Sequence, residues 1–384
     1  MAARLSIICI WICFIALLII GIVMVASTST GVSGSTEASV ALTRQGIFAG
    51  LGLIAALVIS RFDYHHLRRL IFPWLWVGCV ILLAACFSPI GKEVNGEYRW
   101  LNLGVFTFQP SEVAKCILMI TLAHWYTTHR EVAGRFWQGF VWPGALFGIP
   151  LLLILVEKDM GTAAALAVSG FCVMFVAGAR TWVLGLALII GFLVLYDQAT
   201  GSANRMERIY AWTDTEAHAR GAGRQQWIAH LAIMEGGVEG VGLGNSAYKY
   251  GSLPFAHTDF IYAILGEEWG FIGSAGVLFL FTLMTMSGIV LALQIRDTFG
   301  RLLAVGLVCT IFWPALLNMM VVTAILPNTG LPLPFISYGG TNLVFTIVSI
   351  GLLTSIQCNT PTIRKSYMPL RRLQDKHHKH VNPT

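Results

Sequence analysis

The stretch PFAHTDFIYAILGEE, residues 254–268, carries acidic side chains in a segment that is otherwise apolar enough to cross a membrane. His257 and Asp259 stand near its start, and Glu267 and Glu268 come about two helical turns later. A charged group in a bilayer costs free energy, so each acid needs a partner, access to water or a chemical role. A partly buried carboxylate at the mouth of a membrane helix could act as a general base.

The start of this helix bears on whether Asp259 caps the helix or does chemistry. Thr258 is a favoured cap residue, which would leave Asp259 in the first turn, where the helix dipole also favours an acid. On an ideal helix Glu267 lies about 80° round from Asp259, and Glu268 points the opposite way. We therefore predict a helix that begins near residue 259, and a cavity that Asp259 and Glu267 can line together.

Cationic side chains are expected on the same side of the membrane as these acids. They are Arg99, Arg205, Arg208, Arg220, Arg224 and Lys249. Arg205 and Arg208 are three residues apart and would share one face of a helix, where paired guanidinium groups suit a phosphate or pyrophosphate. A solvated loop or contact with lipid headgroups would explain any one of these cations as well.

Lys115 is predicted about one turn inside a membrane helix, and Glu112 stands three residues before it on the same face. A lysine at this depth must pair with an acid or reach water. The sequence leaves open whether Lys115 pairs with Glu112 or contacts a substrate. Ser111 and Glu112 also look like a helix start, so capping or pairing within a loop is the simpler explanation for Glu112.

The composition places these residues in a polytopic membrane protein. The chain has 384 residues, of which 56% are hydrophobic and only 11% charged, and its mean hydropathy is +0.72. This is far too apolar for a soluble domain of that length. The eight cysteines fall in or beside apolar runs without metal-ligand spacing, so we expect small buried side chains rather than a redox or metal centre. No cofactor is evident, a divalent cation is left open, and no nucleic-acid partner is expected.

Apolar runs predict an all-α fold with ten membrane-spanning helices. They lie near residues 5–27, 43–60, 70–87, 110–127, 140–156, 161–178, 181–197, 259–293, 301–323 and 341–358. Ten spans put both termini on one side, and the Lys and Arg residues of the short loops predict that this side is cytoplasmic. Residues 1–358 then form one transmembrane domain with a large extracytoplasmic loop at 198–258, in which 224–235 has the period of an interfacial half-helix. Residues 359–384 form a basic cytoplasmic tail, whose HHKH sequence could bind metal but is better explained as a solvated tail near anionic lipid.

In four blocks the chain resembles the SEDS family (shape, elongation, division and sporulation) of bacterial peptidoglycan polymerases. The blocks are VNGEYRWLNLGVFTFQPSEVAK (94–115), EKDMGTA (157–163), GVGLGNSAYKYGSLPFAHTDFIYAILGEEWGFIG (240–273) and LPLPFISYGGTNL (331–343). They occur in family order and span most of the chain. The resemblance implies ten transmembrane helices with a large extracytoplasmic loop between helices 7 and 8, in a bacterial cytoplasmic (inner) membrane protein.

The resemblance also implies glycosyl transfer with lipid II, the undecaprenyl-pyrophosphate-linked disaccharide, as donor. Asp259 matches the essential acid of the family and is expected to act as general base on the acceptor sugar hydroxyl. Developing charge on the leaving pyrophosphate would give Lys115, Arg205 and Arg208 their role. The further substrate-binding candidates in the matching blocks and nearby are Glu112, Arg99, Glu267, His257, Lys249, Ser337 and Gly339.

The motifs look more like the division type of the family (FtsW-like) than the elongation type (RodA-like). Either type implies a class B penicillin-binding protein, a single-pass transpeptidase, as partner, together with other division or elongation machinery and membrane lipids. A lipid II flippase and a division scaffold are the competing functions. The polar groups cluster at one membrane face and no internal repeat is evident, which favours the polymerase over a transporter.

Three positions depart from the family pattern. Many relatives have EPD where this chain has Glu-Lys-Asp around Lys158, and an acidic residue where it has Phe255. Division-type members often have a lysine in the turn that here contains Thr329. A mechanism that depended on those side chains would not carry over to this protein.

Overall fold

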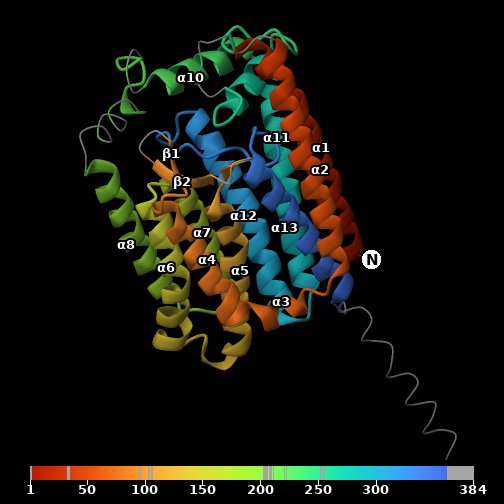
Figure 1. Cartoon of the computed structure of the whole chain (residues 1–384), viewed down its shortest axis with the longest axis vertical. Coiled ribbons are helices and arrows are strands. Elements are labelled where there is room, and N and C mark those ends of the chain that lie inside the picture. The colour runs from red at the N-terminus through yellow and green to blue at the C-terminus, as the bar shows by residue number, and fades with distance from the viewer. Residues whose placement is uncertain are drawn as a thin grey trace, which may run out of the picture.

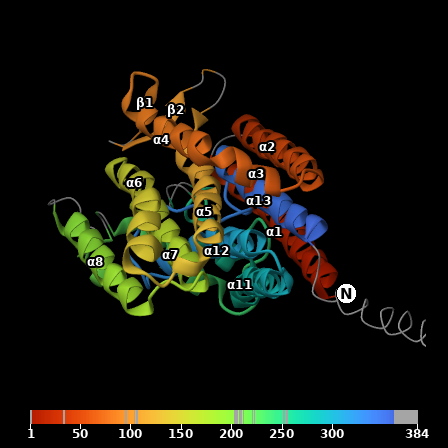
Figure 2. The same ribbon diagram turned by 90° about the horizontal axis from the view of Figure 1, so that it is seen from below.

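The structure is a computed structural model in which the helices run side by side along the long axis, with α10 lying across one end (Figure 1). It describes residues 2–32, 35–94, 97–102, 104, 107–201, 206, 210, 212–219, 221, 223–250, 253 and 256–360. Seen along the bundle, α8 lies at one edge and α1 and α2 lie at the opposite edge (Figure 2).

Helical segments account for about three-quarters of the described chain. The helices are α1 (Ala2–Val32), α2 (Ser35–Arg61), α3 (His65–Leu70), α4 (Trp76–Ala84), α5 (Pro110–Thr128), α6 (Trp142–Val156), α7 (Met160–Val176), α8 (Thr181–Thr200), α10 (Arg224–Gly236), α11 (Ile261–Gln294), α12 (Thr298–Val322) and α13 (Gly340–Asn359). Short helical turns of other types are η1 (Ile71–Leu75), η2 (Ala85–Phe87), η3 (Arg130–Val132) and η4 (Trp137–Val141). Each of the ten predicted ranges overlaps one of these helices, and α10 confirms that residues 224–235 are helical, while their interfacial position stays a prediction.

Six helices in the described chain are long and apolar enough to cross a membrane. They are Ala3–Ser29, Ser39–Arg61, Trp137–Val156, Ile261–Gln294, Thr298–Val322 and Gly340–Asn359. Shorter apolar helices cover Pro73–Phe87, Met160–Val176 and Thr181–Val194. The protein is therefore an all-helical membrane protein in its spanning part.

Helix α12 is central, because it packs against α5, α7 and α11. Small residues allow close approach in these pairs, as is usual for membrane helices. A Cβ atom on Gly306 of α12 would lie 2.9 Å from the sulfur of Met119 in α5, and one on Gly351 of α13 would lie 2.6 Å from the backbone of Ala56 in α2. A larger residue at Gly351 would force α13 and α2 apart, whereas one at Gly306 would first displace the Met119 side chain.

The loop between α4 and α5 holds a small sheet, which the all-α prediction missed. Strands β1 (Gly91–Val94), β2 (Glu97–Asn102) and β3 (Thr107–Phe108) pair antiparallel in the order β1-β2-β3. A register shift between Lys92 and Glu93 interrupts the β1-β2 ladder. This irregularity and the short strands leave too little alternation for the pattern to be recognised in the sequence.

The start of α11 corrects a second prediction. The helix begins at Ile261 without a side-chain cap, and residues 256–260 form turns. Asp259 therefore precedes the helix, and the prediction that Thr258 caps it with Asp259 in the first turn is wrong. Further along, Gly270 has φ 66° and ψ −162°, which kinks α11 where the backbone of Val238 and Gly240 packs against it.

Candidate functional site

The turn that carries Asp259 is held in place by its backbone carbonyls. Ser337 Oγ donates to the carbonyl of Thr258 at 2.6 Å, and the Tyr338 N–H donates to the carbonyl of His257 at 2.9 Å. Asn318 Nδ2, from α12, donates to the carbonyl of Asp259 at 2.8 Å. These carbonyls bond to the 331–338 segment and to α12, which accounts for a helix that starts later than predicted.

Asp259 is half-buried at this end of the bundle. Its carboxylate lies beside Gly330, where an added Cβ would be 3.7 Å from Asp259 Oδ2. Gly330 has φ 69°, a conformation that L side chains rarely adopt, so glycine both shapes the turn and leaves room beside the acid. The neighbouring His257 ring contacts the Tyr338 ring edge-on at 5.7 Å, and burial lowers the pKa of His257 below its ordinary value of 6.5.

The 326–340 loop is fixed from two sides. Gln45 of α2 donates to the carbonyl of Ser337 at 3.3 Å and accepts from the Gly339 N–H at 3.3 Å. From α10, Gln226 donates to the carbonyls of Val321 and Leu326 at 3.0 and 2.8 Å. Ser337 and Gly339 therefore hold the loop beside Asp259 through these hydrogen bonds.

The start of α7 approaches the same loop. A Cβ on Gly161 would lie 2.6 Å from Leu331 and 3.0 Å from the carbonyl of Thr329. The helix is capped by Asp159, whose Oδ1 accepts from the Thr162 N–H at 3.1 Å. The cap thus fixes the helix end that packs on the turn around Gly330.

Arg99 of β2 joins the sheet to this cap. Its Nη2 donates to the carbonyl of Lys158 at 2.6 Å, and its Nη1 lies 3.8 Å from Asp159 Oδ1. Lys158 has φ 65°, whereas a proline ring fixes φ near −65°. The turn of this chain therefore cannot be the one that the EPD pattern gives to relatives, and the Lys158 departure changes the backbone as well as the side chain.

Glu157 is the buried acid of this region, with a relative exposure of 1%. Neither of its carboxylate oxygens accepts from a nitrogen or oxygen donor among the described residues, and the Cys86 thiol is the polar group beside them. Burial, and then the neighbouring charge of Asp159, raise the pKa of Glu157 to about 8. This carboxyl group is therefore protonated at neutral pH.

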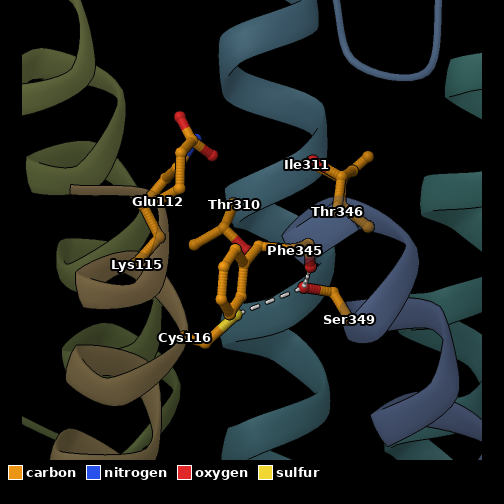
Figure 3. A pocket seen from close by; sticks show the side chains of 8 residues that line it. All are labelled: Glu112, Lys115, Cys116, Thr310, Ile311, Phe345, Thr346 and Ser349. Carbon is orange, nitrogen blue, oxygen red and sulfur yellow. Dashed lines mark hydrogen bonds and ion pairs between the residues drawn. The ribbon is translucent and has the colours of Figure 1, made fainter. Parts of the chain in front are cut away.

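Glu112 and Lys115 form an ion pair at 2.7 Å, as the first of the two alternatives predicted, and contact of Lys115 with a substrate stays a prediction. Asn342 Nδ2 of α13 also donates to Glu112 Oε1 at 3.3 Å, and α5 begins without a side-chain cap, so Glu112 is not its cap. The pair lines a narrow pocket in which side chains of α5 face those of α12 and α13 (Figure 3). The centre of a water molecule can occupy about 10 Å³ of this pocket, so the pocket has room for about one water.

Glu267 and Glu268 are both buried against the loop before Asp259 rather than lining a cavity with it. Glu267 accepts from the Ser246 hydroxyl and from the Ala247 N–H at 2.6 Å. Glu268 pairs with Lys249 at 3.0 Å. The helical angle between Asp259 and Glu267 does not apply, because Asp259 lies outside the helix.

Lys249 is a buried structural cation, with 1% exposure. Its ammonium group donates to Glu268 at 3.0 Å, to Ser27 of α1 at 3.1 Å and to the carbonyl of Gly244 at 2.6 Å. Direct contact with a substrate, as the sequence suggested, would require this set of bonds to open.

The structure brings His257, Asp259, Ser337 and Gly339 together, with Arg99 linked to them through the start of α7. Arg205 and Arg208 lie outside the described residues. Sequence reasoning missed Gln45 and Asn318, which hold the loop and the turn. Polar side chains inside apolar helices were the signal that could have found them. Among the described residues no group of three or more His, Cys, Asp or Glu side chains could hold a metal ion.

Comparison with known proteins gives one matching family model, described as "Cell cycle protein" and covering FtsW, RodA and SpoVE, over residues 7–361. Among curated proteins, the "Probable peptidoglycan glycosyltransferase FtsW" of Trichlorobacter lovleyi is 36% identical over 345 residues, 89% of this chain and 90% of that one. The protein of the same name from Geobacter metallireducens is 36% identical over 346 residues, 89% of this chain and 92% of that one.

Solved structures share the fold. A chain from a study of polymerization and crosslinking by a peptidoglycan synthase complex matches with a TM-score of 0.75 and 28% identity, covering 91% of this chain and 97% of that one. The rod shape determining protein RodA of Thermus thermophilus matches with a TM-score of 0.68 and 27% identity, covering 91% of this chain and 96% of that one.

Proposed function

The chain belongs to the FtsW, RodA and SpoVE family of cell cycle proteins, and from this premise we propose that it is a peptidoglycan glycosyltransferase that acts in cell division. Its substrate is lipid II, from which it transfers glycan to build the polymer. The similarity to curated relatives named FtsW, over about nine-tenths of the chain, supports the division type. The elongation type is the second candidate, because RodA has the same fold.

The observation that carries this function is the placement of Asp259. The half-buried carboxylate of Asp259 lies beside Gly330. Hydrogen bonds from Ser337, Tyr338 and Asn318 to the backbone carbonyls of its turn hold it in this position. We assign Asp259 the role of general base. It takes the proton from the acceptor sugar hydroxyl while that oxygen attacks the anomeric carbon of the donor. The bond from the anomeric carbon to the pyrophosphate oxygen breaks, and undecaprenyl pyrophosphate leaves with the electron pair.

The leaving pyrophosphate requires positive charge near it. Lys115, Arg205 and Arg208 are the proposed sources, since guanidinium and ammonium groups are the usual partners of phosphates. The ion pair with Glu112 places Lys115 in the narrow pocket of Figure 3. Arg99 contributes indirectly, because it binds the cap of α7, which packs against the loop beside Asp259.

The proposed topology has ten membrane segments and both termini in the cytoplasm of a bacterial inner-membrane protein. Residues 198–258 form the large extracytoplasmic loop, so Asp259 meets the lipid II headgroup at the outer face. The proposed partner is a class B penicillin-binding protein, whose transpeptidase crosslinks the new glycan. The relation to a chain of a peptidoglycan synthase complex supports this partner.

The test is polymerisation of labelled lipid II by purified protein with its transpeptidase partner, followed by gel separation of the glycan chains. We expect Asp259→Asn to lower the rate by about 10²–10⁴-fold, the usual effect of removing a general base. Asn keeps the shape of the side chain, and the turn is held by carbonyl groups that the substitution leaves intact. Asp214→Asn, at an exposed acid, is the matched control and should retain activity.

Near-normal polymerisation by the folded Asp259→Asn protein would remove Asp259 from the chemistry. Loss of that protein from the membrane would show a structural role instead. Absence of glycan products from the unaltered protein with each candidate partner would count against the polymerase and favour transport of lipid II or a scaffold role.

A further inference from the structure

A second pocket lies at the end of the bundle opposite to Asp259. It is lined by Tyr126, Arg130, Val176, Ala177, Thr298, Arg301 and Leu302. These residues come from the C-terminal ends of α5 and α7, the turn after α5, and the first turns of α12. The centre of a water molecule can occupy about 130 Å³ of this pocket, roughly ten times as much as in the pocket beside Lys115. This is enough space for a small polar group.

The charge of this pocket is positive. Arg130 and Arg301 are the charged residues in its lining. Arg130 is exposed, whereas Arg301 is half-buried and its Nε is buried without a hydrogen-bond partner among the described residues. The Tyr126 hydroxyl is already committed, because it donates to the carbonyl of Gly139 at 2.6 Å.

The acids nearest along the chain are Glu131, which follows Arg130 and is exposed, and Asp297, and no ion pair joins either of them to the two arginines among the described residues. Asp297, the cap of α12, accepts from the Gly300 N–H at 2.8 Å and from the Tyr64 hydroxyl at 3.0 Å. Its remaining close contact is His65 Nε2 at 3.5 Å. Thr298 is the first residue of α12, and the carboxylate of Asp297 already offsets the positive end of the helix dipole there, so the two guanidinium groups are the charges left for an anion.

We propose that this pocket binds a phosphate group, carried by an anionic membrane lipid or by free phosphate. Two guanidinium groups suit phosphate through paired hydrogen bonds. Val176, which lines the pocket and is 47% exposed, supplies apolar surface beside the arginines, as a lipid with acyl chains requires. Basic pockets between membrane helices are known to hold lipid headgroups.

This site is separate from the proposed glycan chemistry. Asn318, which contacts the Asp259 turn, lies near the C-terminal end of α12, whereas Thr298 and Arg301 lie at its N-terminal end. A helix of 25 residues separates its two ends by about 37 Å. Binding here can therefore be measured without a polymerisation assay, and its failure leaves the proposed function untouched.

The experiment compares lipid binding by the full-length protein and three variants. Purified protein in detergent is titrated with phosphatidylglycerol or phosphatidylcholine, and bound lipid is counted by native mass spectrometry. Arg130→Gln and Arg301→Gln each remove one lining charge, and Arg135→Gln removes a charge from an exposed arginine of the same connection that does not line the pocket. A parallel thermal melt in sodium phosphate, with sodium chloride at equal ionic strength as reference, tests free phosphate.

We expect one phosphatidylglycerol to bind the unaltered protein and the Arg135→Gln control, and about tenfold weaker binding after Arg130→Gln or Arg301→Gln. Stabilisation by sodium phosphate that is lost in the same two variants, without a phosphatidylglycerol effect, would assign the pocket to free phosphate. Equal binding of lipid and equal stabilisation by phosphate across all four proteins would overturn the proposal. Arg130 is exposed on a turn, so its substitution tests the site even if Arg301→Gln fails to fold.

Discussion

Glu157 makes the stability of this protein depend on pH in a predictable direction. Its pKa is raised from an ordinary value of 4.5 to about 8 in the folded protein, by burial and then by Asp159. Between these two values the folded state holds the proton and the unfolded chain has lost it. The free energy of unfolding contributed by this residue is therefore fully present below pH 4.5 and is lost as pH rises to about 8.

We predict that Glu157→Gln removes this dependence, because Gln has the same shape and stays neutral. The melting temperature of the variant relative to the unaltered protein should rise as pH increases from about 4.5 to about 8. At the upper end of this range, the free energy of unfolding of the variant should exceed that of the unaltered protein by on the order of a few kcal/mol. Thermal unfolding in detergent across this range provides the measurement, with Glu239→Gln, at an exposed acid, as control. A difference that stays constant with pH would contradict the raised pKa.

At the scale of elements, a buried ion pair joins three segments that are distant in sequence. Lys249 and Glu268 lie 3.0 Å apart with side-chain exposures of 1% and 0%, and Ser27 donates to Glu268 Oε1 at 2.6 Å. The cluster ties the 244–249 loop to α1 and α11. That loop precedes the turn of Asp259 in the sequence and α11 follows it, so the pair holds together the segments on either side of this turn.

We predict that Lys249→Met destabilises the protein by about 3–5 kcal/mol, because it leaves Glu268 buried without its cation. The double variant Lys249→Met/Glu268→Gln should lose clearly less than the sum of the two single losses. Thermal unfolding of the four proteins gives this double-mutant cycle. Additive losses would show that the two residues stabilise the fold independently.

Local sequence signals predicted the helices well, and long-range contacts explain where they failed. The ten apolar runs and the half-helix at 224–235 each correspond to a helix, and Glu112 and Lys115 pair because three residues of spacing place them on one face. The start of α11 could not be predicted, since Ser337 and Asn318 bond its preceding turn from positions about 60 to 80 residues away. Such contacts leave no periodic signal near Asp259.

At the scale of the whole molecule, the two ends of the bundle differ in chemistry. The end with Asp259 carries the sheet, α10 and the 326–340 loop (Figure 1). At the other end the helices are joined by short connections, and hydrogen bonds link these connections to neighbouring segments. Ser355 of α13 donates to the carbonyl of Phe62 at 2.6 Å, and Arg180 Nε donates to the carbonyl of Gly134 at 2.7 Å. These connections carry Arg130, Arg135, Arg180 and Arg296.

Clustering of arginine in short connections predicts that this end faces the cytoplasm. We therefore expect a cysteine introduced at exposed Glu216, in the long loop, to react with a membrane-impermeant maleimide on intact spheroplasts. A cysteine introduced at exposed Arg135 should react only after permeabilisation. The unaltered chain measures background labelling from its own cysteines, of which Cys358 is exposed. The reverse pattern would place the Asp259 end in the cytoplasm, where it could not deliver glycan to the outer face of the membrane, and would refute both the topology and the direction of polymerisation.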